Sequence, residues 1–243
     1  MRTPWRDYLS DFHAERPGIT EQLLQRTRDA AGRTPYDWVA DAVPRGTAVL
    51  DLACGSAPLA ERLVASYLGI DLSAPELALA RSKGAPVVRA DAGRLPVADE
   101  AVDVVVVSMA LMLVPLSATL AEVRRVLRPG GRLVALLPAT GPMPARDLLR
   151  FARLCVALRH RGLAYPNDAA LADGVPGFAT LTDARVGFRC EIDSDDTAQL
   201  LLRSLYLPEV GPERMAHGAA VVSRWVGTSM TTPLRLLVAE PGA

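Results

Sequence analysis

The chain has 243 residues, of which 50% are hydrophobic and 22% are charged, so it is able to bury a full core as one globular domain. Its 27 lysine and arginine residues balance 27 aspartate and glutamate residues, which excludes an overall field that would draw the chain to nucleic acid or to an anionic membrane. The balance does not exclude local charged patches. We therefore expect a single domain with neither nucleic acid nor a membrane as partner.

The cysteines and the apolar runs indicate where the protein resides. Cys54, Cys155 and Cys190 are odd in number, far apart and without Cys-x-x-Cys spacing, so we expect neither disulfides nor a metal site. Residues 1–20 lack the apolar centre of a signal peptide, and no apolar run reaches the roughly 18 residues of a membrane span. The sequence therefore predicts a soluble, cytoplasmic protein.

In chain order, residues 1–45 are predicted to be helical, because Ile19 and Leu23 fall on one face of a stretch capped by Gly18 or Thr20. A strand at 48–52 then leads through the small-residue loop Ala-Cys-Gly-Ser-Ala into an amphipathic stretch, which predicts a helix over 58–65. A turn of this kind lets a ligand approach backbone amides closely at a helix N-terminus. The strand, turn and helix therefore mark a binding site.

Two acids narrow the class of ligand. Asp51 lies in the first strand, and Asp71 follows the strand expected at 66–70, where a carboxylate accepts hydrogen bonds from ribose hydroxyls. The first loop has no Gly-Lys-Ser/Thr, and the charge of Asp51 would repel a pyrophosphate. The pattern thus predicts a nucleoside that carries a cationic amino or sulfonium group.

The rest of the central region alternates between helix and strand. We expect helices at 75–82 and 117–127, and strands at 86–90, 102–108 and 132–138. Short valine-rich strands that alternate with helices favour a parallel sheet covered on both faces, with residues 102–107 in its central strand.

Beyond residue 138 the alternation stops. A loop leads into a predicted cap helix at 145–160, whose leucines recur at helical spacing while its arginines share another face. We divide the single domain, 1–243, into a helical part at 1–45, a core at 46–138, a cap insertion at 139–183 and a terminal part at 184–243. In the terminal part we expect a strand at 184–192, a helix at 195–205 and a strand at 232–239.

Four segments, in this order, resemble motifs of the class I S-adenosylmethionine-dependent methyltransferases: residues 50–57, 69–73, 90–92 with 95–96, and 126–133. The resemblance covers residues 47–138. It implies a Rossmann-like α/β fold, with an open, mostly parallel sheet of seven strands, helices on both faces and a C-terminal antiparallel strand pair. It also implies that residues 1–45 form a lid.

The resemblance further implies which residues hold the cofactor, S-adenosyl-L-methionine. The loop backbone would lie against its methionine part, the acid of the second strand would bind the ribose, and an Asp-Ala pair would flank the adenine. The positions so assigned are Asp51, Ala53, Cys54, Gly55, Ala57, Asp71, Leu72, Asp91, Ala92, Ser108 and Met109. The loop departs from the family pattern, since alanine replaces the outer two of its three usual glycines and alanine disfavours positive φ.

Methyl transfer from a sulfonium is an in-line displacement, so the protein mainly holds donor and acceptor in a dry pocket, and a base is needed only when the acceptor must lose a proton. His13 is the candidate catalytic base, with a solvated or capping role as its alternative. His160 is expected at a helix end, and His217 falls in an irregular polar segment. Cys54 has no histidine nearby in sequence to activate it, so we expect it to pack.

The sequence therefore predicts a methyltransferase that acts on O or C of a small acceptor, an apolar one to judge from the spread of methionines, such as a secondary metabolite. An NAD(P)-dependent oxidoreductase is an alternative, because such enzymes also have the loop and the ribose-binding acid. Against it, the sequence matches Gly-x-Gly-x-x-Gly weakly and has no Tyr-x-x-x-Lys pair. Neutral charge and 5% aromatic residues disfavour RNA methylation. A non-catalytic, cofactor-binding methyltransferase-like protein is a further alternative, because Ala53 and Ala57 alter the loop.

Overall fold

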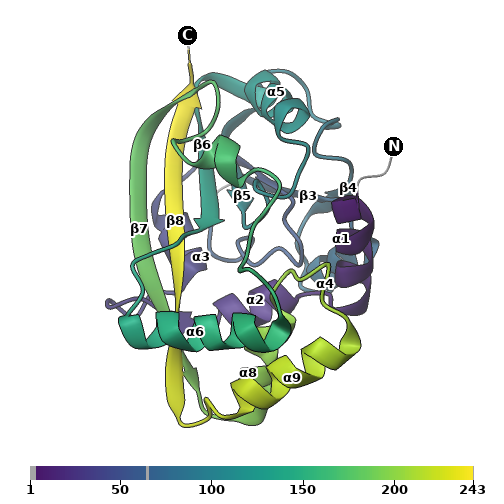
Figure 1. Ribbon diagram of the computed structural model, residues 1–243. Helices are drawn as coiled ribbons and strands as arrows, with labels where there is room; N and C mark the ends of the chain where they lie inside the picture. Colours follow the sequence, from purple (N-terminus) through teal and green to yellow (C-terminus); the bar gives the residue numbers. More distant parts are fainter. Residues whose placement is uncertain (1–3, 64–65, 243) are drawn as a thin grey trace.

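The computed structural model describes residues 4–63 and 66–242, and within them the chain forms one mixed sheet of eight strands (Figure 1). The strands are β1 (Thr27–Arg28), β2 (Ala48–Leu52), β3 (Ser66–Asp71), β4 (Val87–Arg89), β5 (Val102–Ser108), β6 (Leu127–Pro138), β7 (Phe178–Ile192) and β8 (Thr228–Pro241). Their spatial order is β1-β7-β8-β6-β5-β2-β3-β4. Five neighbouring strands run parallel, in the spatial order β6, β5, β2, β3 and β4. Beyond β6 the sheet continues with β8, β7 and β1, and each of these pairs antiparallel with its neighbour.

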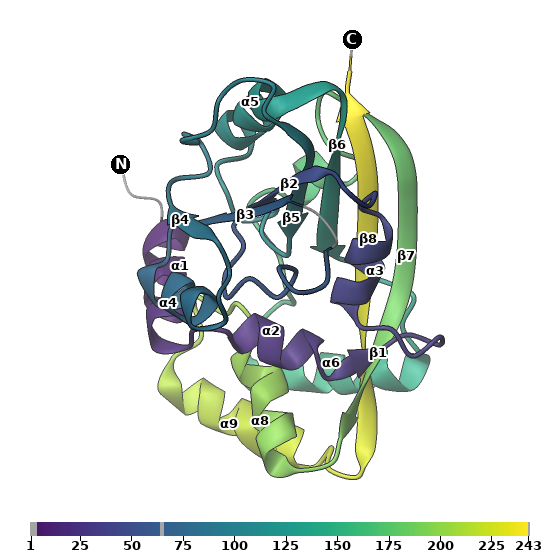
Figure 2. The ribbon, with the colours of Figure 1, turned by 180° about the vertical axis from the view of Figure 1, so that it is seen from behind.

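Helices cover both faces and one end of this sheet. They are α1 (Pro4–Glu15), α2 (Ile19–Leu24), α3 (Pro35–Asp41), α4 (Ala74–Ser82), α5 (Leu116–Val126), α6 (Ala145–Leu158), α7 (Asp168–Leu171), α8 (Asp195–Arg203) and α9 (Pro212–Ser223). Helix α5 packs on one face through Leu120 and Val123, and α3 packs on the other through Trp38 and Val39. Helices α6, α8 and α9 gather around the lower part of the long strands β7 and β8 (Figures 1 and 2).

Strand β5 shows why the central part of the chain folds as a covered sheet. Val105 and Val107 join the apolar cluster on the α5 face, whereas Val104 and Val106 join the cluster on the α3 face. All four are buried, because successive side chains of a strand point to opposite faces and both faces here are covered. The predicted central strand is confirmed, and it lies between β2 and β6.

All seven predicted strands form, and the structure adds an eighth. The addition is β1, whose residues Thr27 and Arg28 pair antiparallel with Cys190 and Arg189 of β7. Two residues are too short to show a period in the sequence, so the count of seven was wrong by this edge strand. The expected terminal antiparallel pair, β7 and β8, is present. Strand β7 begins six residues earlier than predicted and ends where predicted, and β8 is longer than predicted at both ends.

The helix predicted over 58–65 is wrong for residues 58–63, and positions 64–65 lie outside the described residues. The stretch forms turns instead, in which the Arg62 amide donates to the Leu59 carbonyl at 3.0 Å. In an α-helix that amide would donate to the carbonyl of Pro58. Here the Arg62 guanidinium occupies the Pro58 carbonyl at 2.5 Å, so a side chain competes with the helical bond.

Helix α9 was missed, because its segment was predicted to be irregular and to hold His217 outside any helix. The sequence there contains Gly218, which lowers helix propensity. In the structure Gly218 allows close packing, since a Cβ at this position would lie 2.6 Å from Cδ2 of Leu158 in α6. The terminal part therefore contains two helices, α8 and α9, between its two long strands.

Candidate functional site

The carboxyl ends of strands β2, β3 and β5 open into a cavity of about 1190 Å³, which helix α1 covers from the other side. The cavity is lined by ten of the eleven residues predicted to bind the ligand, and also by His13. The exception is Ala57, which is buried away from the cavity in a small cluster with Ala80 and Ala85. The sheet thus gathers side chains from four separate segments into one place.

The loop after β2 adopts the left-handed backbone that its alanines disfavour. The φ angles of Ala53, Gly55 and Ala57 are 56°, 54° and 56°, so the two alanines occupy conformations normally given to glycine. The loop is tied to β3, because the Cys54 amide donates to the Ile70 carbonyl at 3.0 Å. Turns replace the expected helix in residues 58–63, so no helix N-terminus stands behind the loop there. The Ala57 amide donates to the Cys54 carbonyl at 2.9 Å, which closes a turn within the loop.

Asp71 fastens the loop to the end of β3 and faces the cavity. Its Oδ2 accepts from the Gly55 amide at 2.8 Å, and its Oδ1 accepts from the Ser73 amide at 2.7 Å. Burial raises the pKa of Asp71, and these two backbone bonds oppose the rise. Each carboxylate oxygen has a second lone pair, so the group is able to accept hydroxyl protons from a ligand as well.

Asp51 is buried at the floor of the cavity with one oxygen unpaired. Its Oδ2 accepts from the Tyr67 hydroxyl at 2.7 Å, while Oδ1 has no hydrogen-bond partner among the described residues. Burial raises the pKa of Asp51 to about 7, so the group is only partly ionised at neutral pH. Ser108, at the end of β5, also lines the cavity and holds a buried hydroxyl without a partner in the described chain. Such orphaned polar atoms point to a polar ligand group.

Asp91 lies at the far end of this row of strand ends. Its Oδ1 accepts from the Gly93 amide at 2.9 Å, as a turn-capping residue does, and its Oδ2 pairs with the Arg6 guanidinium at 2.9 Å. Arg6 belongs to α1, so the pair ties the outer end of that helix to the sheet. No local pattern predicts this pair, since the two positions are 85 residues apart. Leu72 and Ala92 line the cavity beside these acids.

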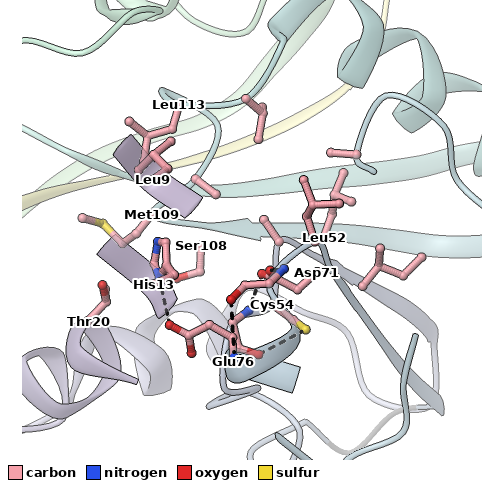
Figure 3. A pocket seen from close by; sticks show the side chains of 18 of the residues that line it. Leu9, His13, Thr20, Leu52, Cys54, Asp71, Glu76, Ser108, Met109 and Leu113 are labelled. Carbon is pink, nitrogen blue, oxygen red and sulfur yellow. Dashed lines mark hydrogen bonds and ion pairs between the residues drawn. The ribbon is translucent and has the colours of Figure 1, made fainter. Parts of the chain in front are cut away.

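Sequence reasoning also missed Glu76, the partner of His13. Nδ1 of His13 lies 2.8 Å from Oε1 of Glu76 (Figure 3). The Tyr206 hydroxyl lies 3.4 Å from Nε2, the other nitrogen of the ring. Glu76 is buried, and its Oε2 accepts from the Gly18 amide at 3.0 Å. The spacing from Ser73 to Glu76 predicts a capping box at the start of α4. Only Ser73 caps the helix, and the carboxylate of Glu76 turns to α1 instead.

The wall opposite the strand ends is apolar and aromatic, and we call it the helix side. Trp5, Leu9, Leu113 and Tyr206 line it, and Met109 borders it at the end of β5. Figure 3 shows Leu9, Leu113 and Met109 together, facing Asp71 and Cys54 across the cavity. We call the wall formed by Asp51, residues 53–55, Asp71, Asp91 and Ser108 the sheet side.

Aromatic packing holds the helix side together. The ring of Phe12 lies 4.7 Å from that of Tyr206, and the ring of Trp5 lies 6.3 Å from that of Tyr165. Burial raises the pKa of Tyr206 to about 12, so its hydroxyl keeps its proton at neutral pH. The spread of methionines was the reason to expect an apolar acceptor, but Met109 is the one methionine among the described residues that borders the cavity. Met112, Met143, Met215 and Met230 pack in or against apolar clusters.

Cys54 is buried and faces Tyr67 and the loop rather than an activating histidine. Burial raises the pKa of its thiol, and the nearby Asp51 adds to the rise, so the group is a packed thiol and not a nucleophile. Within residues 4–63 and 66–242 no group of three or more histidine, cysteine or acidic residues is placed to hold a metal ion. In the same residues no helix has the length and apolarity needed to cross a membrane.

An open α/β sheet with acids at adjacent strand ends around a cavity is a nucleoside-binding architecture. Residues 50–135 match the family model of a methyltransferase domain. Demethylmenaquinone methyltransferase of Mycolicibacterium paratuberculosis (strain ATCC BAA-968 / K-10) is 35% identical over 196 residues, which cover 71% of this chain and 84% of that protein. The chain therefore belongs to the class I S-adenosylmethionine-dependent methyltransferases.

Other similarities agree with this family but extend over different lengths. Demethylmenaquinone methyltransferase of Mycobacterium sp. (strain KMS) is 39% identical over 130 residues, 52% of this chain, and the chain spans little more than half of that relative, 56%. The crystal structure of the [4+2]-cyclase SpnF has a TM-score of 0.61 at 19% identity, and the match covers 100% of this chain and 98% of that one. This last likeness shows the Rossmann-like fold alone.

The cofactor of the family, S-adenosylmethionine, fits the sheet side of the cavity. Its cationic amino and sulfonium groups suit the unpaired oxygen of Asp51 and the unpaired hydroxyl of Ser108. A pyrophosphate would meet the carboxylates of Asp51 and Asp71 instead. The cofactor is S-adenosylmethionine, and the nicotinamide alternative is set aside.

Proposed function

We propose that the protein is a methyltransferase that moves the methyl group of S-adenosylmethionine to O or C of a small, apolar acceptor, such as a secondary metabolite. One observation carries this proposal: a single cavity joins a polar side with unpaired buried acceptors, Asp51 Oδ1 and Ser108 Oγ, to a helix side of aromatic and aliphatic groups. Relatives named demethylmenaquinone methyltransferases support a small-molecule acceptor. The three cysteines are unpaired, which suits a reducing compartment such as the cytoplasm.

On the sheet side we assign a role to each segment. Asp71 would accept the ribose hydroxyls, and Asp91 with Ala92 would border the adenine. Asp51 and Ser108 would face the cationic methionine end, where Gly55 has no side chain to obstruct a close approach to the backbone. When bound, S-adenosylmethionine supplies an electrophilic methyl group on a sulfonium. The side chains themselves orient and desolvate the reactants.

His13 is proposed as the base for acceptors that must lose a proton. If Nδ1–H donates to Glu76, the lone pair is left on Nε2, which faces the cavity beside the Tyr206 hydroxyl. Glu76 is then a positioning residue, because it fixes the ring and its tautomer from a buried site. A proton taken from the acceptor would reside on Nε2, and the carboxylate of Glu76 would stabilise the resulting imidazolium.

The proposal for His13 is tested by His13→Ala, with His217→Ala in the distant helix α9 as the matched control. We expect His13→Ala to lower turnover by about 100-fold, the lower range for loss of a general base, with the affinity for S-adenosylmethionine unchanged. Glu76→Gln should lower turnover and shift its pH profile, which a purely structural contact would not do. Unchanged turnover in His13→Ala would remove His13 from the reaction.

The cofactor assignment is tested by calorimetry with S-adenosylmethionine, its demethylated product and NAD. We expect the first two to bind and NAD to give no signal. Binding of NAD alone would reverse the assignment. One alternative has support of its own: the strained Ala53 and Ala57 leave open a protein that binds the cofactor without transfer. Cofactor binding without turnover in a broad acceptor screen would favour this second function.

A further inference from the structure

Helix α6 carries two apolar faces, and only one of them is packed. Leu154 and Leu158 are buried in a cluster with α8 and α9. On the opposite face Leu148, Leu149 and Val156 are 57%, 53% and 78% exposed. The sequence predicted one apolar face containing Leu148, Leu149, Leu154 and Leu158 together. The structure separates them, because the two pairs point in opposite directions around the helix.

The exposed apolar residues form a continuous stripe. Ala145, Leu148, Leu149, Ala152 and Val156 are spaced i, i+3, i+4, i+7 and i+11, which places them on one side of a helix, and all five are exposed. In Figure 1 helix α6 runs across the outside of the lower part of β7 and β8. A stripe of this length on an outer helix is typical of a surface that meets another apolar phase.

The segment that carries the stripe is strongly positive, although the whole chain has no net charge. Residues 145–161 hold five arginines and one aspartate. Asp147 is fully buried, and it accepts from the amide and hydroxyl of Thr231 and pairs with Arg150, so both charges turn inward. The others are Arg146, Arg153, Arg159 and Arg161, and all four are exposed.

These exposed arginines are available to an outside partner. Within residues 4–63 and 66–242 no carboxylate makes an ion pair with Arg153, Arg159 or Arg161, and the contact of Arg146 with buried Asp147 is 3.6 Å long. Arg146 and Arg153 border the apolar stripe on one flank, as their helical positions require. The stripe and the arginines together match the design of a helix that lies in a membrane interface.

We propose that this face, residues 145–161, docks the protein on an anionic phospholipid membrane. The leucines and valine would enter the boundary between headgroups and acyl chains, while the arginines would meet phosphate groups. Charge argues against a second copy as the occupant, because a twofold contact would bring two sets of arginines together. This proposal differs from the expectation, drawn from zero net charge, that no membrane is a partner, because it rests on a local patch and not on the net charge.

The position of the docking face also suits the cavity. The chain that leaves α6 reaches Pro166 and Asn167, which line the cavity, and Asn167 Nδ2 donates to the carbonyls of Leu111 at 2.9 Å and Val114 at 2.8 Å. A membrane under α6 would therefore lie near the end of a segment that borders the helix side. An apolar acceptor dissolved in the bilayer would reach the cavity along this segment. This last point rests on the proposed function, whereas the docking itself does not.

Docking is tested with the full chain and two sets of vesicles, one of phosphatidylcholine alone and one that also contains phosphatidylglycerol. We expect co-sedimentation with the second set only, weakening as salt rises. The double variant Leu148→Ser/Leu149→Ser should weaken binding at least about tenfold, since burying one leucine contributes about a tenfold change in partitioning. Arg146→Gln/Arg153→Gln should abolish the preference for anionic vesicles.

The matched control is Leu181→Ser on β7, which removes a leucine of similar exposure, 46%, outside the docking face and should leave vesicle binding unchanged. Melting temperature and cofactor affinity should be unaltered in every variant, so a loss of vesicle binding cannot be a loss of fold. Absence of binding to anionic vesicles would overturn the proposal. So would a dimer, seen by sedimentation equilibrium, that Leu148→Ser/Leu149→Ser dissociates while no vesicles bind. Failure of methyl transfer with intact docking would instead count against the proposed function alone.

Discussion

The two sides of the cavity are built in different ways. The sheet side comes from the ends of parallel strands β2, β3 and β5, where main-chain ladders fix Asp51, Asp71 and Ser108. The helix side comes from α1 and from loops around residues 113 and 166, held by aromatic packing. A rigid wall suits a ligand that is always the same, and an irregular wall suits one that differs among relatives. We therefore expect the cofactor on the sheet side and the acceptor on the helix side.

The largest effect should come from removing the acid of the sheet side. Asp71→Ala should weaken S-adenosylmethionine binding by about 1.5–3 kcal/mol, the value of hydrogen bonds to a charged group, or roughly 10- to 150-fold. Calorimetry measures the change. Unaltered affinity would show that the ribose lies elsewhere.

The matched variant on the helix side is Trp5→Ala. It should raise the KM for the acceptor and leave cofactor affinity within about twofold, since the indole lines the opposite wall. The melting temperature of each variant is the control for loss of fold. It is needed because Asp71 also accepts a hydrogen bond from the Gly55 amide, so its removal affects the loop as well as the ligand. Equal loss of cofactor binding in both would break the division into two sides.

A smaller effect is expected from pH, through Asp51. Its pKa of about 7 in the folded protein lies above the ordinary value near 4, so between these pH values the folded state holds a proton that the unfolded chain releases. Asp51 therefore makes the protein without cofactor less stable as pH rises from about 4 to 7. A cationic ligand favours the ionised form, so cofactor affinity should rise about tenfold from pH 6 to pH 8.

The control for this prediction is Asp51→Asn, which keeps the shape and removes the titration. Its calorimetric affinity should be flat over the same pH range, and its stability should lose the decline between pH 4 and pH 7. The same rise in Asp51→Asn as in the native chain would assign the pH dependence to another group.

The smallest effect concerns the strained loop of the sheet side. Ala53→Gly should raise the free energy of unfolding by about 1 kcal/mol, because glycine adopts a φ of 56° without the steric cost that alanine meets. Urea denaturation measures it. Ala57→Gly should gain less, since the Ala57 methyl is buried against Ala80 and Ala85. A loss of stability in Ala53→Gly would show that the loop carries no strain at this position.

The sheet side was predictable from sequence, and the helix side largely was not. Asp51, Gly55 and Asp71 stand at fixed places relative to apolar strands, so a local pattern gives their position in space. Glu76, Arg6 and Tyr206 reach the site by contacts between distant segments, which no local pattern records. The same holds for helix α9, where a glycine disfavours the helix locally and tertiary packing against Leu158 outweighs it.

Two predictions failed for a related physical reason. Helical periodicity describes one segment by itself and does not show which other groups compete for its backbone or cover its side chains. The helix at 58–65 fails in its described part because the Arg62 side chain takes the carbonyl of Pro58. In the predicted cap helix, now α6, the leucines were read as one set at helical spacing, although Leu148 and Leu149 are exposed while Leu154 and Leu158 are buried. In both cases the spacing of apolar residues was read correctly from the sequence. The contacts that these segments make depend on neighbouring groups in the folded protein, which the spacing does not show.

Helix α1 is held at its two ends by bonds of unequal strength. The Arg6–Asp91 pair is solvent-exposed, with side chains 54% and 38% accessible, and pairs of this kind are worth less than about 1 kcal/mol. His13 meets Glu76 in a nearly dry environment, where the carboxylate is 5% accessible. The consequence is a preferred direction of opening: the helix should swing outward from Arg6 while His13 serves as the pivot. Because the proposed site puts the adenine beside Asp91, spent cofactor would then leave at that end, and added salt would speed its release by screening the Arg6–Asp91 pair.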